Sequence, residues 1–236
     1  MKQAIILAGG KGTRLRPFTA TLPKPLVPLG EMPIIEVVLR QLQAAGFEEA
    51  VLSVGHLAEL VEAYCGDGSK WGLPIRYARE EKPLSTAGPL RIVTDLQDDF
   101  LTINGDILTT LDFRALFDFH RRSGSLATVS VCERKILVDF GVIALDGDST
   151  VSAYDEKPER TYTVSMGVNV FSRKVVDHIR DGESLGIPDL VQRLIAAGEK
   201  VSAFRSPCDW LDIGCTPDYE QAQALFQSPE RKRYLR

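Results

Sequence analysis

Near the N-terminus stands the run Ala4-Ile5-Ile6-Leu7-Ala8-Gly9-Gly10-Lys11-Gly12-Thr13-Arg14-Leu15-Arg16. Its first four residues are apolar at every position, which is typical of a short strand buried on both faces. The glycines that follow expose backbone N–H groups, and a glycine-rich loop wraps phosphate oxygens without Cβ clashes. Because the same loop carries one lysine and two arginines, the run predicts a buried strand followed by a phosphate-binding loop.

This loop differs from the two commonest nucleotide-binding fingerprints. No Lys-Ser/Thr pair closes a G-x-x-x-x-G-K frame, and Leu15 stands where the dinucleotide pattern needs its third glycine. An ordinary tight turn with solvated basic residues is the structural alternative. The charge and glycine content favour a triphosphate over that alternative.

Apolar strands and amphipathic helices alternate through the first half of the chain. After the first strand we expect helices at 33–45, 57–65 and 86–96 and from Asp112 onward, and strands at 50–54, 74–78 and 100–103. Such alternation predicts an α/β fold, in which a Rossmann-like, mixed and mainly parallel sheet has helices on both faces. Ligands of such sheets gather at the carboxyl ends of the strands.

The second half of the chain is richer in strand-like segments. We expect strands at 126–132, 141–145, 151–154, 164–171 and 201–204, and helices at 175–179, 187–197 and 217–226. Asp146-Gly147 is typical of a hairpin turn. Because we find no repeat and no flexible linker, we expect a single domain whose second half completes the pocket.

Composition excludes several classes of protein. The 236 residues carry a net charge of −4, which argues against a nucleic-acid-binding surface. The four cysteines are scattered without a C-x-x-C pair, so neither a zinc site nor a disulfide framework is indicated. No apolar run approaches the ~20 residues of a membrane span, and the N-terminus lacks a signal-peptide pattern. We therefore expect a cytoplasmic protein with no nucleic-acid or membrane partner.

A second run, Leu22-Pro23-Lys24-Pro25-Leu26-Val27-Pro28, places prolines on both sides of one lysine. Prolines restrain the backbone, so the lysine side chain between them is held in a restricted range of directions. Residues 7–28 as a whole resemble the signature of the sugar-1-phosphate nucleotidyltransferases, the family of glucose-1-phosphate thymidylyltransferases and mannose-1-phosphate guanylyltransferases. Later motifs resemble the family's in order and spacing: Thr86-Ala87-Gly88, Asn104-Gly105-Asp106, Phe140-Gly141-Val142, Glu156-Lys157-Pro158 and Trp210-Leu211-Asp212-Ile213-Gly214.

The resemblance implies an enzyme that joins a nucleoside triphosphate to a sugar 1-phosphate, giving a nucleotide sugar and pyrophosphate. It implies that Arg14 and Lys24 are catalytic and that Asp106 and Asp212 hold Mg²⁺. The implied nucleotide-binding residues are Leu7, Ala8, Gly9, Gly10, Gly12, Thr13, Arg14, Thr86, Ala87 and Gly88. The implied sugar-phosphate-binding residues are Gly141, Glu156, Lys157 and Ser165.

The same resemblance divides the domain, residues 1–228, into a nucleotide-binding half at about 1–125 and a sugar-phosphate-binding half at about 126–228. Residues 229–236, with Arg231-Lys232-Arg233, are expected to form a solvated basic tail, and a phosphate or partner contact is the alternative. Many relatives carry a C-terminal β-helix or a dimerising extension. Because this sequence stops soon after its last expected helix, we expect no acetyltransferase fusion and no β-helix-mediated assembly, while a homodimer stays open.

The chemistry independently requires residues of these types. Attack of a sugar-phosphate oxygen on the α-phosphorus brings two anions together, so cations must neutralise them and fix the in-line approach. Arg14, Lys24, Lys157 and Mg²⁺ meet that need, and Mg²⁺ prefers a few carboxylates together with phosphate oxygens. Helix capping is the structural alternative for Asp106 and Asp212.

The base and the sugar are the open part of the prediction. Segments 84–90 and 105–108 resemble those of mannose-1-phosphate guanylyltransferases, which favours GTP and a mannose- or heptose-type 1-phosphate. Ser165-Met166-Gly167 stands where many relatives have Asn-Ala-Gly, so the sugar stays open, and uridylyl-, thymidylyl- and cytidylyltransferases are alternatives. A catalytically silent paralogue that binds nucleotide sugars and regulates a partner is the alternative from another class. A glycosyltransferase would use Asp146-Gly147-Asp148 as a D-x-D metal motif, which we reject because these residues suit a turn.

Overall fold

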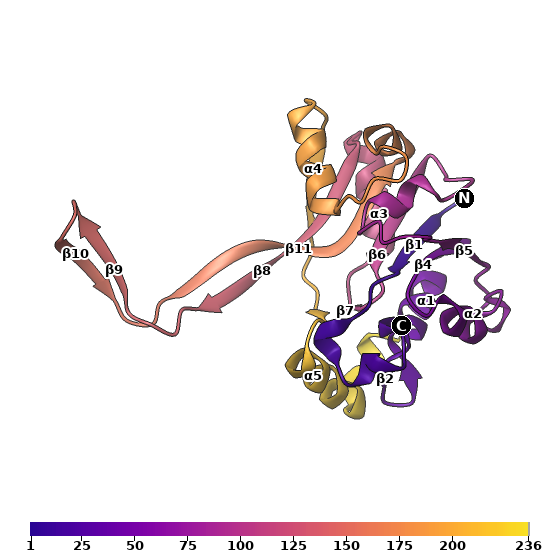
Figure 1. Ribbon diagram of the computed structural model, residues 1–236, viewed down its shortest axis with the longest axis horizontal. Coiled ribbons are helices and arrows are strands. Elements are labelled where there is room, and N and C mark those ends of the chain that lie inside the picture. The colour runs from indigo at the N-terminus through magenta and orange to yellow at the C-terminus, as the bar shows by residue number, and fades with distance from the viewer. Residues whose placement is uncertain (236) are drawn as a thin grey trace.

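The computed structural model describes residues 1–235, so Arg236, the last residue of the expected tail, lies outside the described residues. Its centre is a seven-stranded sheet in the order β12-β8-β11-β6-β1-β4-β5 (Figure 1). The strands are β1 Gln3–Ala8, β4 Glu49–Val54, β5 Ile75–Arg79, β6 Asp99–Asn104, β8 Ala127–Leu137, β11 Glu159–Ser172 and β12 Val201–Arg205. Strands β6, β1, β4 and β5 run parallel, whereas β11 is antiparallel to both of its neighbours. The predicted mixed, mainly parallel sheet is confirmed.

Helices cover both faces of this sheet. They are α1 Ile34–Ala44, α2 Ala58–Cys65, α3 Phe113–Ser123, α4 Ile187–Ala196 and α5 Thr216–Gln227. Along β1, Ile6 points to the face covered by α1, α2 and α3, and Ile5 to the face covered by α4. This alternation explains why β1 is apolar at every position, since a strand buried on both faces has no solvent side. Within residues 1–235, no helix combines the length and apolar character needed to cross a membrane.

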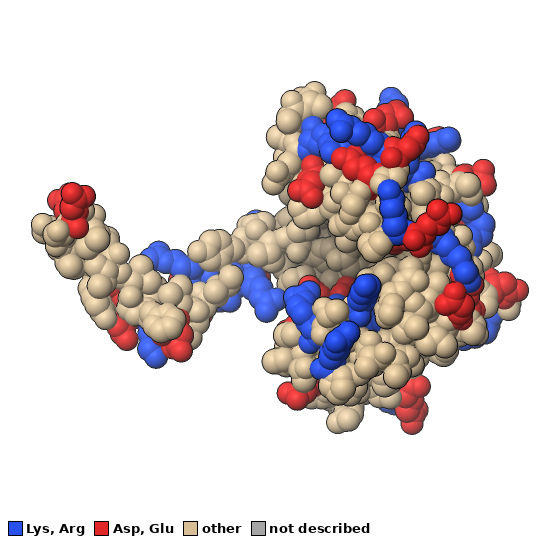
Figure 2. Space-filling view, viewed as in Figure 1, with Lys and Arg blue, Asp and Glu red and all other residues tan. Residues whose placement is uncertain are grey.

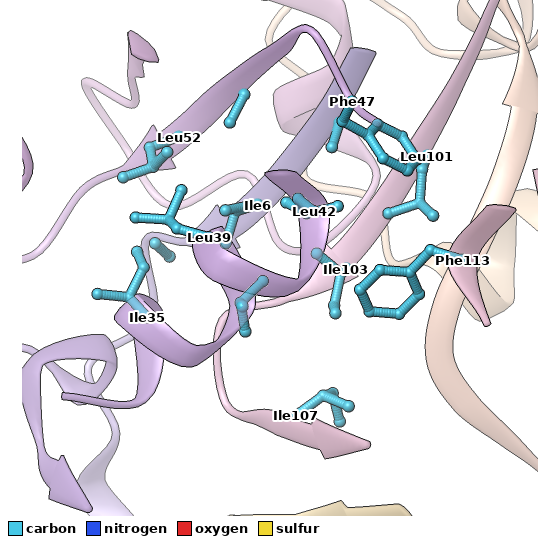
Figure 3. Packing of buried hydrophobic residues seen from close by; sticks show 14 of the residues in the cluster. Ile6, Ile35, Leu39, Leu42, Phe47, Leu52, Leu101, Ile103, Ile107 and Phe113 are labelled. Atoms are coloured by element: carbon cyan, nitrogen blue, oxygen red, sulfur yellow. The ribbon is translucent and has the colours of Figure 1, made fainter. Parts of the chain in front are cut away.

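The larger core lies between α1, α3 and the middle of the sheet. Figure 3 shows Leu39 and Leu42 of α1 packed over Ile6 and Ile103, with Phe113 of α3 beside them. All of these side chains are buried. The core therefore anchors β1 and β6 side by side.

Two expected helices are short 3₁₀ turns instead. Residues 86–96 contain only η5 Gly88–Arg91, and the segment 175–179 overlaps η6 Arg173–His178. In the first segment, the N–H groups of Ala87 and Gly88 both donate to Leu185 O, at 2.8 and 3.1 Å. Gly88 and Pro89 are poor helix formers, and the turn that forms is closed by i→i−3 hydrogen bonds, from Leu90 N to Ala87 O at 3.0 Å and from Ile92 N to Pro89 O at 3.2 Å.

Two small sheets were not predicted because their strands are too short to show alternation. Strand β2 Pro28–Leu29 pairs with β3 Met32–Pro33, and β7 Ile107–Thr109 pairs antiparallel with β13 Trp210–Asp212. The second pair joins a segment just after β6 to one near the C-terminus. It places Asp212 opposite Ile107.

Strands β8 and β11 continue beyond the sheet as a two-stranded ribbon, which carries a hairpin at its far end. The hairpin consists of β9 Val142–Asp146 and β10 Thr150–Asp155, and the predicted turn at Asp146-Gly147 is confirmed, with Gly147 at φ 66°. We call residues 133–163 the arm. Figure 1 shows the arm projecting far from the rest of the molecule, which we call the body.

The C-terminal tail packs more closely than expected. Residues Pro229–Arg233 form the 3₁₀ helix η7, and the Tyr234 side chain is buried, with its ring centroid 6.1 Å from that of Phe226. Arg233 Nη2 lies 2.7 Å from Asp209 Oδ2. Arg231, Lys232 and Arg233 are exposed, in line with a solvated basic tail, whereas the apolar contact of Tyr234 with α5 was not predicted.

The predicted N-cap of α3 supplies a test of the fold. The Asp112 side chain accepts a hydrogen bond of 2.9 Å from Ala115 N, as predicted from its place before Phe113. We expect Asp112→Ala to lower the free energy of unfolding by about 1 kcal/mol, or roughly 2–4 °C in Tm for a chain of this size. Arg122→Ala, at an exposed position of the same helix, is the control. Equal thermal stability of the two variants would contradict the cap.

Candidate active site

A cleft of about 400 Å³ opens at the carboxyl ends of β1 and β6. The predicted residues on its wall are Leu7, Ala8, Gly9, Gly10, Gly12, Thr13, Arg14, Lys24, Thr86 and Asp106. Figure 2 shows the body hollowed next to the root of the arm, with Lys and Arg side chains gathered along one rim. The structure therefore brings most of the predicted nucleotide-binding and catalytic residues together, and their roles stay predictions.

The glycine-rich loop is held tightly at Gly12. This residue has φ 60°, and a Cβ there would lie 3.0 Å from Thr19 Cγ2 and 3.1 Å from Lys24 Cβ. Thr19 Oγ1 donates a hydrogen bond of 2.7 Å to Gly12 O. Because a left-handed backbone in close contact with a neighbour favours glycine, the loop keeps one defined shape beside Lys24.

Lys24 and Asp106 form an ion pair on the cleft wall. Lys24 Nζ donates to Asp106 Oδ2, and the two side chains are only 12% and 19% exposed. The other carboxylate oxygen, Asp106 Oδ1, is buried without a hydrogen-bond partner within the described residues. An unpaired buried carboxylate oxygen is costly, so it is suited to a cation.

Asp212 joins this pair through the β7–β13 sheet. Ile213 N donates to Asp106 O at 3.1 Å, so the two aspartates lie on adjacent segments. Burial, and then the charge of Asp106, raise the pKa of the Asp212 carboxyl, while Lys24 and Arg14 lower it in part. The Arg14 guanidinium lies over Gly214, where an added Cβ would be 3.5 Å from its nitrogens. Two carboxylates and two cations therefore meet at one point.

These residues fit a divalent cation that is shared with a substrate. No group of three or more His, Cys, Asp or Glu side chains within residues 1–235 has the arrangement of a metal site. Mg²⁺ is commonly held by one or two carboxylates, with phosphate oxygens and water filling the other positions. The partnerless oxygen of Asp106 and the raised pKa of Asp212 match that use.

Ala87 and Gly88 shape the cleft without lining it. Both are buried, and a Cβ on Gly88 would overlap the backbone oxygen of Glu183. Thr86 faces the cleft and accepts a hydrogen bond of 2.8 Å from Ile187 N. Of the three predicted residues in this motif, only Thr86 reaches the cleft wall.

Three of the four predicted sugar-phosphate residues lie on the arm, outside the cleft. Gly141, Glu156 and Lys157 are together where the β8–β11 ribbon meets the hairpin, a place that we call the joint. Tyr154 Oη donates to Glu156 Oε2 at 3.1 Å, and a Cβ on Gly141 would overlap Tyr154 Oη. Lys157, at φ 48°, pairs with Asp139 at 2.8 Å. Ser165 is separate from them, opposite Val131 at the root of the arm.

Several residues of the cleft wall were not predicted. They are Pro25, Glu80, Pro83, Ser85, Asn104, Gly105 and Gly214. Glu80 accepts hydrogen bonds from Ser53 Oγ at 3.1 Å and from Leu84 N at 2.9 Å, which hold its carboxylate in place. Glu80 and Asn104 stand at the carboxyl ends of β5 and β6, so the rule that led us to Asp106 also points to both.

Comparison with known proteins gives consistent matches over nearly the whole chain. Residues 3–228 match the family model described as Nucleotidyl transferase. The chain is 34% identical over 240 residues to UTP–glucose-1-phosphate uridylyltransferase of Synechocystis sp., covering 93% of this chain and 62% of that protein. It is 34% identical over 227 residues to mannose-1-phosphate guanylyltransferase of Mycobacterium tuberculosis, covering 94% of this chain and 63% of that protein. The chain thus spans less than two thirds of the length of these two relatives.

Among solved structures, HddC from Yersinia pseudotuberculosis has the same fold. The TM-score is 0.76 at 23% identity, and the match covers 96% of this chain and 100% of that chain. HddC has also been solved in complex with GMP-PN.

The two carboxylates lead to a prediction about stability. The pKa of Asp212 is higher in the folded than in the unfolded protein, so ionisation of this carboxyl destabilises the fold. The loss of stability develops as the pH rises from the pKa of the unfolded state through the pKa of the folded state. We therefore expect Asp212→Asn to raise the Tm of the metal-free protein at neutral pH. We also expect Mg²⁺ to raise the Tm of wild type but not that of Asp212→Asn. Thermal unfolding with and without Mg²⁺ measures both effects. A lower Tm in the metal-free variant would contradict the repulsion between Asp106 and Asp212.

Proposed function

Since the chain belongs to the nucleotidyl transferase family, we propose that it transfers a nucleotidyl group from a nucleoside triphosphate to a sugar 1-phosphate and releases pyrophosphate. The observation that carries this proposal is the meeting of Lys24, Asp106 and Asp212 beside the glycine-rich loop. A triphosphate needs backbone N–H groups, cations and a divalent ion, and these residues suit all three.

In the proposed reaction, an oxygen of the sugar 1-phosphate attacks the α-phosphorus. A new P–O bond forms, the bond from the α-phosphorus to the bridging oxygen breaks, and pyrophosphate leaves with the electron pair. The attacking oxygen is already anionic, so no general base is needed. When bound, Mg²⁺ supplies charge neutralisation and a fixed orientation of the phosphates, and Asp106 and Asp212 would hold it.

Lys24 and Arg14 would stabilise the charge that develops during this displacement. In the structure Lys24 pairs with Asp106, and a cation on that carboxylate would release the ammonium toward the phosphates. Arg14 extends over Gly214 at the same wall, where its guanidinium would lie beside the leaving pyrophosphate. Preorganised cations in a half-enclosed site contribute much of the rate enhancement in phosphoryl transfer.

The base favoured by the cleft is guanine. The Glu80 carboxylate is fixed on the wall by Ser53 and Leu84, and a carboxylate accepts two parallel hydrogen bonds well. Guanine offers two adjacent donors, N1–H and the N2 amino group. Uracil and thymine offer one N–H between two carbonyl oxygens, which a carboxylate repels. The named activity of the mycobacterial relative and the HddC complex with GMP-PN agree with this choice.

UTP is the main alternative, because the Synechocystis relative is named as a uridylyltransferase, and dTTP and CTP stay open. For the sugar, we favour a mannose- or heptose-type 1-phosphate bound by Gly141, Glu156, Lys157 and Ser165. A silent regulatory paralogue is disfavoured because the phosphate-handling cations and both metal-binding aspartates are present.

A panel of nucleotides and sugar phosphates tests the reaction. We expect pyrophosphate release with Mg²⁺, GTP and a hexose or heptose 1-phosphate, and a fall in kcat of about 10²–10³-fold in Lys24→Ala, typical of losing a preorganised cation. Lys232→Ala, at an exposed position of η7, is the control. Binding of nucleotide sugars without turnover by any pair would instead support the regulatory paralogue.

The role of Glu80 is tested by Glu80→Gln. Glutamine has nearly the same shape as glutamate, and Ser53 Oγ can still form a hydrogen bond with its side-chain amide. We expect kcat/KM for GTP to fall by about 10–100-fold, as for loss of one good bidentate contact, while kcat/KM for UTP changes little. An unchanged Tm would show that the loop is intact. Equal losses for GTP and UTP would contradict base reading by this side chain.

A further inference from the structure

The arm buries almost none of its surface on the body. Within residues 133–163, nearly every residue is exposed, Pro158 being the fully buried exception. An isolated two-stranded ribbon is at best marginally stable in water. A ribbon of this length therefore requires a surface to pack against.

The hairpin at the end of the arm has one continuous apolar face. Ile143 pairs directly with Tyr154, and Leu145 pairs with Val151, so all four side chains point the same way. They are 50–63% exposed. An antiparallel sheet normally packs its apolar face on a core, and an uncovered apolar face marks an interaction surface.

The β8–β11 ribbon holds the joint away from the cleft of its own chain. The ladder from Val131↔Ser165 to Leu137↔Glu159 is continuous, which sets the joint about 20 Å beyond the sheet at ~3.3 Å per residue. Bending at the joint moves only the hairpin, and Gly141, Glu156 and Lys157 stay where they are. To bring them back to their own cleft, the whole ribbon would have to swing about its root, where the pairing of β8 with β11 shifts register between Ser165 and Asn169.

We propose that two copies of the chain exchange arms, so that the joint of each copy completes the cleft of the other. This rests on the proposed function, because Gly141, Glu156 and Lys157 are its sugar-phosphate residues. Each cleft then combines Arg14 and Lys24 of one chain with Lys157 of its partner. Reciprocal exchange about a two-fold axis gives a closed dimer with two identical sites.

A second copy fits better than an unrelated protein. Every chain carries both halves of the site, the cleft and the joint. Exchange of arms between two copies gives each cleft a joint, and no other protein is needed. The arm offers roughly 30 residues, the number found on each side of a standard protein interface. In the segment that joins the glycine-rich loop to Lys24, Phe18 and Leu22 are exposed and offer the incoming arm an apolar surface.

The oligomeric state tests the exchange without reference to activity. We expect a dimer by light scattering of the full chain at micromolar concentration, and a monomer for the double variant Ile143→Asp/Leu145→Asp. Ser149→Asp adds charge in the hairpin turn, away from the apolar face, and is expected to stay dimeric. A monomeric wild type, or a double variant that stays dimeric, would overturn the proposal.

Mixing two inactive variants tests where the joint acts. Lys24→Ala damages the cleft and Lys157→Ala damages the joint, and the mixed dimer is isolated after co-expression with two affinity tags. With exchanged arms, one site carries both substitutions and the other carries neither, so we expect about half of the wild-type activity from the one intact site. If each arm serves its own cleft, the mixed dimer stays as inactive as its parents, which would overturn the exchange. A wild-type dimer that turns over no substrate would overturn the proposed function and leave the exchange standing.

Discussion

The hydrogen bond from Gly105 N to Leu7 O, 2.9 Å long, extends the parallel pairing of β6 with β1 by one residue beyond the strands. It brings the start of the glycine-rich loop and the segment of Asp106 to the same edge of the sheet. A Cβ at position 105 would lie 3.1 Å from Leu7 O, so the close approach favours glycine. The Lys24–Asp106 pair, the cleft and the meeting with Asp212 all depend on this register.

The parts of the fold that were predictable are those set by neighbouring residues. The strand at β1, the helix α1, the cap at Asp112 and the turn at Gly147 each depend on a local pattern, and each is present. In place of the helix expected at 86–96 there is a 3₁₀ turn at Gly88–Arg91, and the N–H groups of Ala87 and Gly88 hold this segment to Leu185, almost a hundred residues later. A partner so distant in sequence leaves no periodic signal.

The site likewise has a part that the sequence made predictable and a part that it did not. Placing the glycine-rich loop and Asp106 together required only the rule that ligands gather at the carboxyl ends of parallel strands. Placing the joint required the length and direction of the β8–β11 ribbon, which the separate strand signals at 126–132 and 164–171 did not reveal. Glu80 went unnoticed because its segment, Glu80-Glu81-Lys82, reads as an ordinary charged loop.

The pairing of β13 with β7 also has a consequence in time. As the chain leaves the ribosome, β1, β4 and β6 can pair once the first hundred or so residues have emerged, and Asp106 is then in place. Asp212 follows roughly 5–20 s later at the usual ~5–20 residues per second of translation. A nascent chain therefore carries the glycine-rich loop and one carboxylate well before the second arrives, and the proposed metal–nucleotide site is complete only after β13 has emerged.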